Sequence, residues 1–396
     1  MTVLYIHRTQ GRGVERVHID GICKGFSERG LNTIEISPNG KPIVPPTYPN
    51  NKKNAKKSSL ASKLSSHAPE WAFEIVEMLY NLMAIYKAIR SGVTTPQFVY
   101  ERYAIFSIAG LVISRLRRCP LIIECNYTTL NPLFRQRTKL FLPIGRWVDQ
   151  MVLSRATVIV CVSTTIKEQI EKHYGIRGDH VIIQPNASDI PKIAKNNNTE
   201  VEGLKPENKV IGFVGGFYPW HGLPILAEAF LLTLNSVPDA RLLLIGEGPE
   251  KERTEQILKV HGALDKVIFT GQIPHHKLND YLQRFDVGVM PDSNDYGSPM
   301  KIFEYMAFGV PVVAPDYPPI TEVFDGQGIC FVKNDVHSLS AALTKMITDA
   351  ALNKKFGHRG KELVHTRHNW QSNADQTLQA LASSTGLGLD NKLVTK

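Results

Sequence analysis

A lysine and a glutamate stand three residues apart in a short segment of the second half of the chain. Lys301 and Glu304 follow Ser298 and Pro299, and the segment ends at Gly309 before an apolar run. The spacing predicts one helix face near an N-terminus, with Ser298 as the N-cap and Pro299 in the first turn. A cation at a positive helix end can hold a diphosphate, and a carboxylate can accept two hydrogen bonds from a ribose diol. The segment therefore favours a nucleotide site over a surface Lys–Glu pair.

Two glycine-rich turns follow strand-like runs, one in each half of the chain. The first contains Gly11 and Gly13, and the second contains Gly215 and Gly216 and runs to His221. Glycine lets backbone N–H groups approach an anion, and the following helix N-terminus favours negative charge. Neither turn matches the dinucleotide fingerprint or the P-loop. Most turn glycines are structural, so only the pair of turns, facing one cleft, indicates anion binding.

Polar side chains also stand at the predicted carboxyl ends of strands in the first half. These residues are His7, Glu101, Arg102, Glu124 and Asn126. Parallel α/β sheets bind their ligands at this edge. Each residue has a structural alternative: the glutamates can form buried ion pairs, and His7 can be a packed side chain.

Strand-like and helix-like segments alternate along the whole chain. In the first half we expect strands at Val3–His7, Asn32–Ser37, Phe98–Glu101, Leu121–Asn126 and Thr157–Ser163. After a polar linker we expect strands at Lys209–Val214, Arg241–Ile245, Val267–Thr270, Val287–Met290, Val310–Ala314 and Ile329–Val332. Alternation of this kind predicts βαβ units and parallel sheets. The fold class is therefore α/β, with two Rossmann-like domains at 1–190 and 191–370 and a C-terminal tail at 371–396 that packs back on the first domain.

Composition excludes several protein classes. The 396 residues are 43% hydrophobic and 21% charged, which argues against a collagen-like, wholly disordered or disulfide-rich protein. The five cysteines form no C-x-x-C pair, so we expect a reduced, cytoplasmic protein with no structural zinc. The first residues are interpreted as a strand and not a signal peptide.

Positive charge is concentrated in the first half. Residues 1–195 hold 27 Lys and Arg against 14 Asp and Glu, a balance of +13, and 196–396 hold 19 against 23, a balance of −4, which together give the net +9. A basic half favours an acidic partner. Nucleic acid is disfavoured because the basic residues are not interleaved with aromatic ones. The apolar stretch Trp71–Arg90 follows five lysines between Lys52 and Lys63. We interpret it either as a core helix or, together with these lysines, as a peripheral contact with the inner face of an anionic membrane.

At this point the sequence resembles a family. Glu304, Ala307, Gly309 and Pro311 match the C-terminal nucleotide-sugar motif of the retaining glycosyltransferases of family 4, which have the two-domain GT-B architecture. The resemblance extends along most of the chain. It includes the stretches Gly11–His18, Tyr100–Tyr103, Cys161–Ser163, Pro185–Asp189, Phe213–Gly222 and Leu244–Gly248.

The resemblance departs from the family pattern in the donor site. The family motif has two glutamates separated by seven residues, and Tyr296 stands where the first is expected, with Asp295 beside it as a substitute. The arginine and lysine that usually grip the diphosphate align with Gly216 and His221. Lys301, His221 if it is protonated, and backbone amides must then meet the phosphate charge. The usual histidine of the first domain is also missing, and its strand carries Glu124 and Asn126.

The resemblance implies a glycosyltransferase that uses a nucleotide sugar, with UDP-sugar favoured and no metal or other cofactor required. The acceptor is then a glycan or a lipid-linked glycan in polysaccharide or glycoconjugate biosynthesis. It implies catalytic roles for Glu124, Asn126 and Glu101, acceptor binding by Arg102 and His7, and donor binding by Gly13, Gly215, His221, Ser298, Pro299, Lys301 and Glu304. The alternatives are an epimerase or hydrolase of the same fold, and a non-catalytic subunit that binds a nucleotide sugar.

Overall fold

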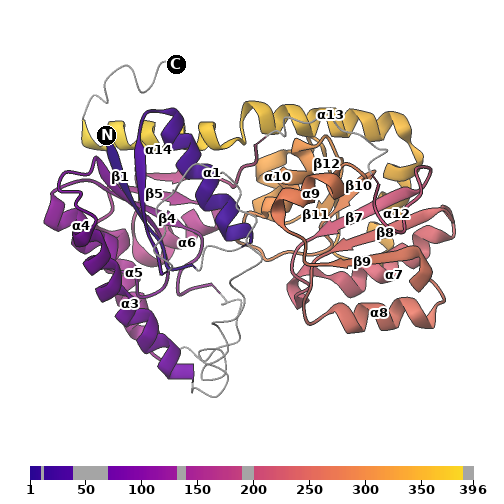
Figure 1. The fold of residues 1–396 in the computed structure, drawn as a ribbon, viewed down its shortest axis with the longest axis horizontal. Coiled ribbons are helices and arrows are strands. Elements are labelled where there is room, and N and C mark those ends of the chain that lie inside the picture. The colour runs from indigo at the N-terminus through magenta and orange to yellow at the C-terminus, as the bar shows by residue number, and fades with distance from the viewer. Residues whose placement is uncertain (10–12, 39–69, 132–139, 190–199, 387–396) are drawn as a thin grey trace. The chain divides into compact units, whose positions relative to one another are not determined.

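The computed structural model describes residues 1–9, 13–38, 70–131, 140–189 and 200–386. It consists of two compact units (Figure 1). The N-terminal unit comprises Met1–Val162, Ile166–Gln184 and Ala374–Lys396, and the C-terminal unit comprises Ser163–Thr165 and Pro185–Asn373. The lysines between Lys52 and Lys63 lie outside the described residues.

The N-terminal unit is built on a parallel sheet whose six described strands lie in the order β2-β1-β3-β4-β5-β6. The strands are β1 (Thr2–Ile6), β2 (Asn32–Ile36), β3 (Phe98–Arg102), β4 (Leu121–Cys125), β5 (Val158–Cys161) and β6 (Val181–Ile183). The helices are α1 (Val14–Glu28), α3 (Glu70–Arg90), α4 (Ala109–Arg117), α5 (Leu142–Leu153) and α6 (Thr164–Tyr174). The three-residue edge strand β6 was not predicted, because so short a run carries little periodic signal.

The C-terminal unit repeats this architecture with the order β12-β11-β10-β7-β8-β9. Its strands are β7 (Lys209–Val214), β8 (Ala240–Ile245), β9 (Val267–Gly271), β10 (Val287–Val289), β11 (Val312–Pro315) and β12 (Ile329–Val332). Its helices are α7 (Leu223–Leu234), α8 (Lys251–Val260), α9 (His275–Leu282), α10 (Met300–Ala307), α11 (Pro318–Phe324), α12 (Val336–Thr348) and α13 (Ala350–Thr366), with 3-10 turns at Pro219–His221 and Leu264–Lys266. The two sheets confirm the predicted fold class of two Rossmann-like domains.

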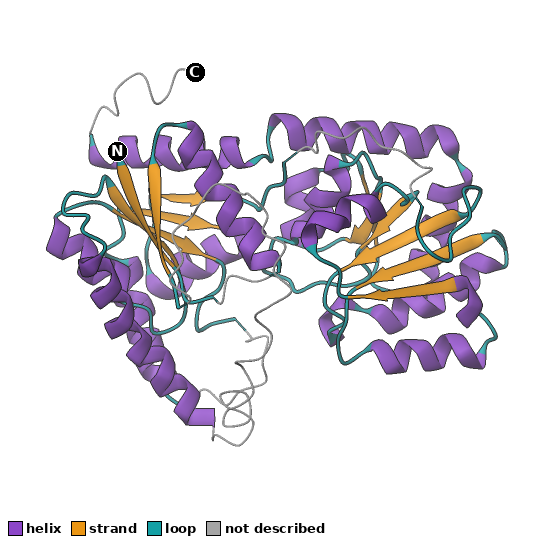
Figure 2. Cartoon of the chain, in the orientation of Figure 1, coloured by secondary structure: helices purple, strands orange, loops and turns teal. Residues whose placement is uncertain are grey.

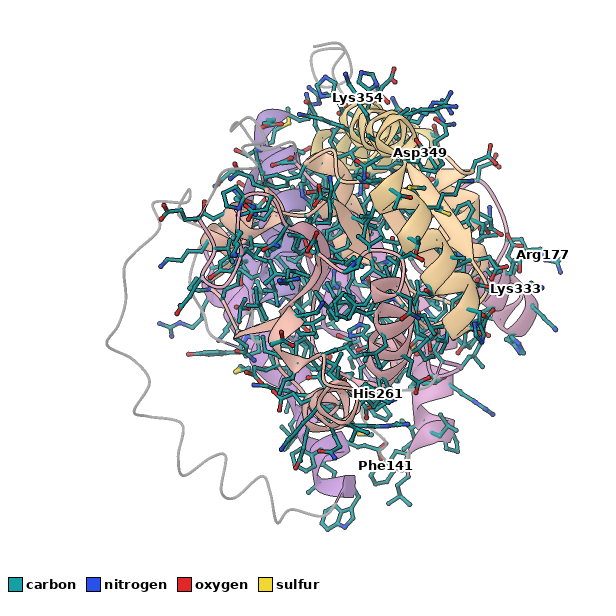
Figure 3. All side chains as sticks on the ribbon, turned by 90° about the vertical axis from the view of Figure 1, so that its right-hand side faces the viewer. Phe141, Arg177, His261, Lys333, Asp349 and Lys354 are labelled. Atoms are coloured by element: carbon teal, nitrogen blue, oxygen red, sulfur yellow. The ribbon has the colours of Figure 1, made fainter. Side chains whose placement is uncertain are left out.

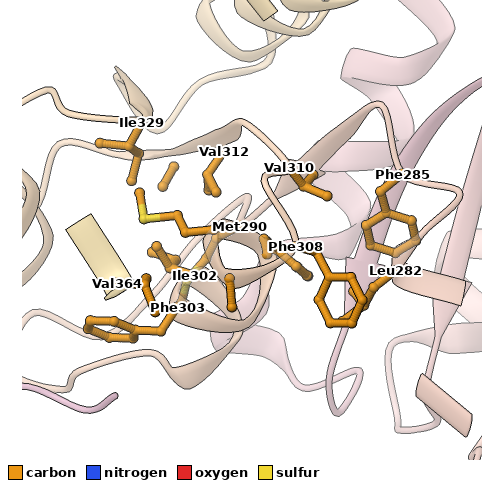
Figure 4. Close-up of a cluster of buried hydrophobic side chains, with 14 of the residues drawn as sticks. Leu282, Phe285, Met290, Ile302, Phe303, Phe308, Val310, Val312, Ile329 and Val364 are labelled. Carbon is orange, nitrogen blue, oxygen red and sulfur yellow. The ribbon is translucent and has the colours of Figure 1, made fainter. Parts of the chain in front are cut away.

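Helices flank the strands of each sheet (Figure 2), so the central residues of most strands are apolar and buried. In β1, Val3 to Ile6 are all buried, as expected for a parallel strand covered on both faces. In the C-terminal unit one core cluster includes Met290, Phe303 and Val312 (Figure 4). This packing fixes α10 firmly against its sheet.

Two C-terminal helices begin at aspartate N-caps. Asp335 accepts a hydrogen bond from Ser338 N at 2.8 Å, and Asp349, labelled in Figure 3, accepts one from Leu352 N at 2.9 Å. The last helix, α14 (Trp370–Thr385), carries the chain into the N-terminal unit. There Arg29 donates two hydrogen bonds to the carboxylate of Asp375, both at 2.5 Å.

Candidate nucleotide-sugar site

The glycine turn after β7 approaches the side chain of Lys301 closely. A Cβ built on Gly215 would lie 3.0 Å from Lys301 Nζ, and Gly215 has φ +146°. Glycine at this position therefore leaves room for the ammonium group and adopts a backbone conformation that other residues rarely take. The turn and α10 bring together two of the predicted donor-binding residues.

Lys301 is a buried cation whose ammonium group has no hydrogen-bond partner among the described residues. Its residue is 9% exposed, and Nζ makes no hydrogen bond within the described part of the chain. Nζ lies 4.5 Å from the centroid of the Phe213 ring, a cation–π contact. Burial lowers the pKa of Lys301 to about 7, while the nearby Glu304 acts in the opposite direction. A buried ammonium with unused donors is costly, unless an anion completes its surroundings.

His221 does not supply the expected positive charge. Its Nδ1 donates to the carbonyl oxygen of Gly216. Burial and, after it, the charge of Lys301 lower the pKa of His221 to about 3. The imidazole is therefore neutral near pH 7, so the protonation on which a phosphate contact by a charged His221 depends is not met. The ring remains beside the glycine turn, where it contacts the edge of Phe213 with a centroid distance of 5.8 Å.

Ser298 fastens the loop before α10 and does not cap the helix. The N-cap is Pro299, with no side-chain capping bond, so the prediction of Ser298 as N-cap is wrong. Ser298 Oγ instead accepts a hydrogen bond from Asn186 N at 2.9 Å, and the Asn186 amide donates to the Ser298 carbonyl at 2.5 Å. Ser163 Oγ donates to the carbonyl of Tyr296 at 2.6 Å. These bonds hold the loop that delivers Lys301.

Glu304 lies one helical turn after Lys301 on α10 and is half-buried. Its position lets it reach solvent while Lys301 points into the unit. Tyr296, at the place of the expected first glutamate, is buried, and the neighbouring Asp295 is exposed. The site therefore holds one carboxylate on α10 and one buried cation beside the glycine turn.

The N-terminal unit has a saturated carboxylate at its carboxyl edge. Glu124 Oε1 accepts from Arg102 at 2.5 Å and from Asn126 at 2.7 Å. Glu124 Oε2 accepts from Tyr100 at 2.8 Å and lies 2.9 Å from His18 Nε2. Burial alone would raise the pKa of Glu124, but the charges of His18 and Arg102 and these bonds hold it well below its usual range. Glu124 is thus an ionised anchor that orients its four donors.

His7 belongs to a second buried pair on the same edge. Its Nε2 lies 2.9 Å from Glu35 Oε1, and Arg16 donates to Glu35 Oε2 at 2.8 Å. Burial opposes ionisation of Glu35, but hydrogen bonds from His7 and Arg16 lower its pKa to about 2. The His7 ring is fully buried and pairs with Glu35. Nothing in this geometry tests its predicted role in acceptor binding, which stays a prediction.

Glu101 points to the face of β3 opposite to that of Arg102, which contacts Glu124. It is fully buried, and it accepts from Ser107 Oγ at 2.5 Å and from Gly110 N at 3.1 Å. Burial raises the pKa of Glu101 to about 7, against the effect of these bonds. The structure therefore does not bring Glu101 together with Glu124, and its contacts favour fixing the start of α4. Its catalytic role stays a prediction.

Gly13 is the N-cap of α1, with φ +59° and its carbonyl accepting from Arg16 N at 3.1 Å. This conformation explains a glycine here; its neighbour Gly11 lies outside the described residues. The sequence analysis missed His18, Tyr100 and Glu35 as site residues. His18 stands in the second turn of a glycine-started helix, which is the one signal that could have singled it out.

Both halves of the chain match known family models. Residues 194–363 match the model described as glycosyl transferases group 1, and residues 12–191 match the model of glycosyltransferase family 4. Together the two matches and the fold place the chain among the GT-B glycosyltransferases.

The curated relatives are distant. A putative teichuronic acid biosynthesis glycosyltransferase, TuaC of Bacillus subtilis, is 25% identical over 269 residues, which are 66% of this chain and 64% of the relative. A UDP-Gal:alpha-D-GlcNAc-diphosphoundecaprenol alpha-1,3-galactosyltransferase of Escherichia coli is 22% identical over 292 residues, 70% of this chain and 73% of the relative. The chain thus spans slightly less than two thirds of the length of TuaC.

Solved structures share the fold at lower identity. Sucrose-phosphate synthase from Thermosynechococcus elongatus superposes with a TM-score of 0.70 at 17% identity, over 96% of this chain and 98% of that chain. Anabaena Alr3699/HepE, solved in complex with UDP and glucose, superposes with a TM-score of 0.69 at 16% identity, over 97% and 100%. These likenesses establish the fold alone.

Proposed function

We propose that this chain transfers a sugar from a nucleoside diphosphate sugar to an acceptor hydroxyl, with retention and without a metal ion. The observation that carries the proposal is Lys301. A buried ammonium beside a glycine turn, with no hydrogen-bond partner described, is suited to a diphosphate. Within the described residues no group of three His, Cys, Asp or Glu side chains is placed to hold a metal ion.

The donor is bound by the C-terminal unit. Lys301 and the backbone amides of the turn at Gly215 hold the diphosphate, and Glu304 accepts hydrogen bonds from the ribose diol. Neutral His221 fixes the turn through its bond to Gly216. In the transfer, the bond between the anomeric carbon and the diphosphate oxygen breaks, the acceptor oxygen bonds to that carbon, and the acceptor proton leaves with the diphosphate. Positive charge at Lys301 stabilises the leaving group.

The N-terminal unit supplies the acceptor side. Glu124 is too fully hydrogen-bonded to accept a proton from an acceptor, so we assign it to positioning Arg102 and Asn126. These two side chains are partly exposed at the carboxyl edge and can contact the sugar or the acceptor. Glu101 positions α4 from the other face of the sheet.

UDP-sugar is the favoured donor, and a glycan or lipid-linked glycan the favoured acceptor. The support comes from the related proteins. HepE was solved with UDP and glucose, and the named substrate of the Escherichia coli relative is a lipid diphosphate.

The test is a thermal-shift screen with UDP, GDP, ADP, dTDP and CMP, with and without magnesium. A ligand at ~100 times its dissociation constant should stabilise the fold by about 2.7 kcal/mol. We expect one nucleoside diphosphate to raise the melting temperature in wild type equally with and without magnesium, and not in Lys301→Met. Absence of any shift would contradict the donor site.

Incubation with a nucleotide sugar, with and without an acceptor glycan, separates the alternative functions. An epimerase or hydrolase would consume the nucleotide sugar without an acceptor, and a binding subunit would bind it without turnover. We expect no product in the absence of acceptor, and we expect transfer when the acceptor glycan is present. Product formation with no acceptor would favour the hydrolase or epimerase.

A further inference from the structure

Helix α3 places its polar side chains against the body of the N-terminal unit. Glu74 Oε2 accepts from Phe141 N at 3.0 Å, and Asn81 donates to the Phe106 carbonyl at 2.8 Å. Lys87 Nζ donates to two carbonyl groups just after β2, at 2.7 and 3.1 Å. The inward face of the helix is thus held by hydrogen bonds.

The outward face of α3 is apolar. Between residues 71 and 90, every side chain in the exposed class is apolar except Arg90 at the last position. The exposed apolar residues are Trp71, Val76, Leu79, Leu82, Met83, Tyr86 and Ile89. Seven such residues on one helix reverse the usual pattern of a surface helix. A contiguous apolar surface of this kind marks an interaction site.

Two neighbouring helices extend this surface. The first turn of α5 is joined to α3 by the bond between Phe141 N and Glu74, and α5 exposes Ile144 and Trp147. Helix α4 packs against α3 and exposes Leu116. Figure 1 shows α3, α4 and α5 along the same flank of the N-terminal sheet. We call the exposed residues of these three helices the docking surface.

The charged side chains described as exposed on the docking surface and at its edges are all arginines. Exposed arginines stand on the three helices or within two residues of their ends, at Arg90, Arg115, Arg118, Arg146 and Arg155. Among the described side chains of α3, α4 and α5, no carboxylate is in the exposed class: Glu74 and Asp149 are buried, and Glu77 pairs with Arg8 at 3.3 Å. The occupant must therefore be both apolar and anionic.

We propose that the docking surface binds an anionic lipid bilayer. Exposed Trp and Tyr among Leu, Ile and Val, with arginines and no exposed carboxylate among the described side chains, suit the boundary between acyl chains and acidic headgroups. A second copy of the chain fits less well, because a symmetric interface would place the arginines against each other. In the described residues no helix has the length and hydropathy of a membrane span, so α3 lies on the bilayer.

The docking surface belongs to the unit that we assign to the acceptor. If the proposed transferase function holds, the surface brings that unit to a lipid-linked acceptor in the bilayer. Lipid binding itself does not depend on that function. A missing nucleotide-induced thermal shift would therefore contradict the proposed function, and a lack of vesicle binding would contradict the proposed docking surface.

The experiment is vesicle flotation of the full chain with phosphatidylglycerol and phosphatidylcholine in equal parts, at low and high salt, against phosphatidylcholine alone. The test variant is Leu79→Glu with Leu82→Glu, at side chains that are 54% and 65% exposed. The matched control is Val260→Glu at the end of α8, 69% exposed in the C-terminal unit. A charge variant replaces Arg90, Arg115 and Arg118 by Gln, with Arg177→Gln as its control.

We expect wild type and both controls to float with the anionic vesicles at low salt. The double glutamate variant should lose at least about tenfold in partitioning, because two exposed apolar side chains no longer enter the bilayer. The arginine variant should lose the preference for phosphatidylglycerol. Melting temperatures of all variants should match wild type, since the replaced side chains are exposed.

Three outcomes would overturn the proposal. In the first, wild type stays with the soluble fraction at low salt, and in the second, the variants float as well as their controls. The third is a wild-type dimer by light scattering that the double glutamate variant converts to a monomer without any change in flotation. That result would assign the docking surface to a second copy of the chain.

Discussion

The two sheets have the same architecture, but they differ in how the buried charge at their carboxyl edges is compensated. In the N-terminal unit, the carboxylate of Glu124 has four partners within 2.9 Å. In the C-terminal unit, Lys301 Nζ is also buried, but it makes no hydrogen bond within the described residues, and the Phe213 ring lies 4.5 Å away. The protein itself satisfies the charge of Glu124, and we propose that a ligand satisfies the charge of Lys301.

The difference separates positioning from binding. A carboxylate whose lone pairs are all used holds its neighbours in place at little cost in reorganisation. An unpaired buried cation lowers stability, and a protein keeps such a group where it gains function. By this argument the donor is recognised mainly in the C-terminal unit, and the N-terminal network presents a rigid surface to the acceptor.

The largest expected effect is the loss of the Glu124 carboxylate. Glu124→Ala leaves four donors without their acceptor, of which His18 and Tyr100 are buried and Arg102 and Asn126 are partly exposed. The free energy of unfolding should therefore fall by about 3–5 kcal/mol. Urea denaturation measures this change. Glu252→Ala, on the exposed face of α8, is the control and should be close to wild type. A loss below about 1 kcal/mol would mean that the network does not hold the unit together.

Lys301→Met should have the reverse effect on stability. Removing a buried, unpaired polar group should raise the free energy of unfolding by about 1–3 kcal/mol. The same change should weaken UDP-glucose binding by about a hundredfold, because a charge-assisted contact to the diphosphate is lost. Calorimetry and denaturation are measured on the same preparation, with Lys277→Met as the exposed control. A variant that loses both stability and binding would argue for a structural lysine.

Glu304→Ala should affect binding and transfer but not folding. The half-buried carboxylate is assigned to the ribose, so its loss should weaken nucleotide binding by about tenfold or more and abolish transfer. The melting temperature without ligand should match wild type. Glu322→Ala, exposed on α11, serves as the control. Full transfer by Glu304→Ala with normal melting would refute the assignment.

The smallest effect is expected for Asn126→Ala. Its amide is one of four donors to Glu124, and it is partly exposed. The free energy of unfolding should fall by about 1 kcal/mol. Transfer should fall more than this loss explains if Asn126 also contacts substrate, which a comparison of kcat and KM resolves. Equal changes in stability and activity would restrict Asn126 to support of Glu124.

The sequence predicted the fold and much of the donor segment, because both rest on local signals. Apolar runs located every described strand except β6 to within two residues, and the Lys301–Glu304 spacing placed both residues on α10. The charge state of His221 was not predictable, since it depends on burial and on Lys301 from a distant segment. The opposite directions of Glu101 and Arg102 do follow from strand alternation. The four partners of Glu124 come from α1, β3 and the residue just after β4, and no short-range pattern reveals the whole network.

The most direct test of the account is the number of protons taken up when UDP-glucose binds. Lys301, with a pKa of about 7 in the free protein, is mostly neutral at about pH 8, and a diphosphate beside it should raise that pKa. Calorimetry in two buffers of different ionisation enthalpy should show uptake of about one proton at that pH, and affinity should fall as pH rises further. Lys301→Met should show neither effect. Binding by wild type without proton uptake would contradict the claim that Lys301 receives the diphosphate.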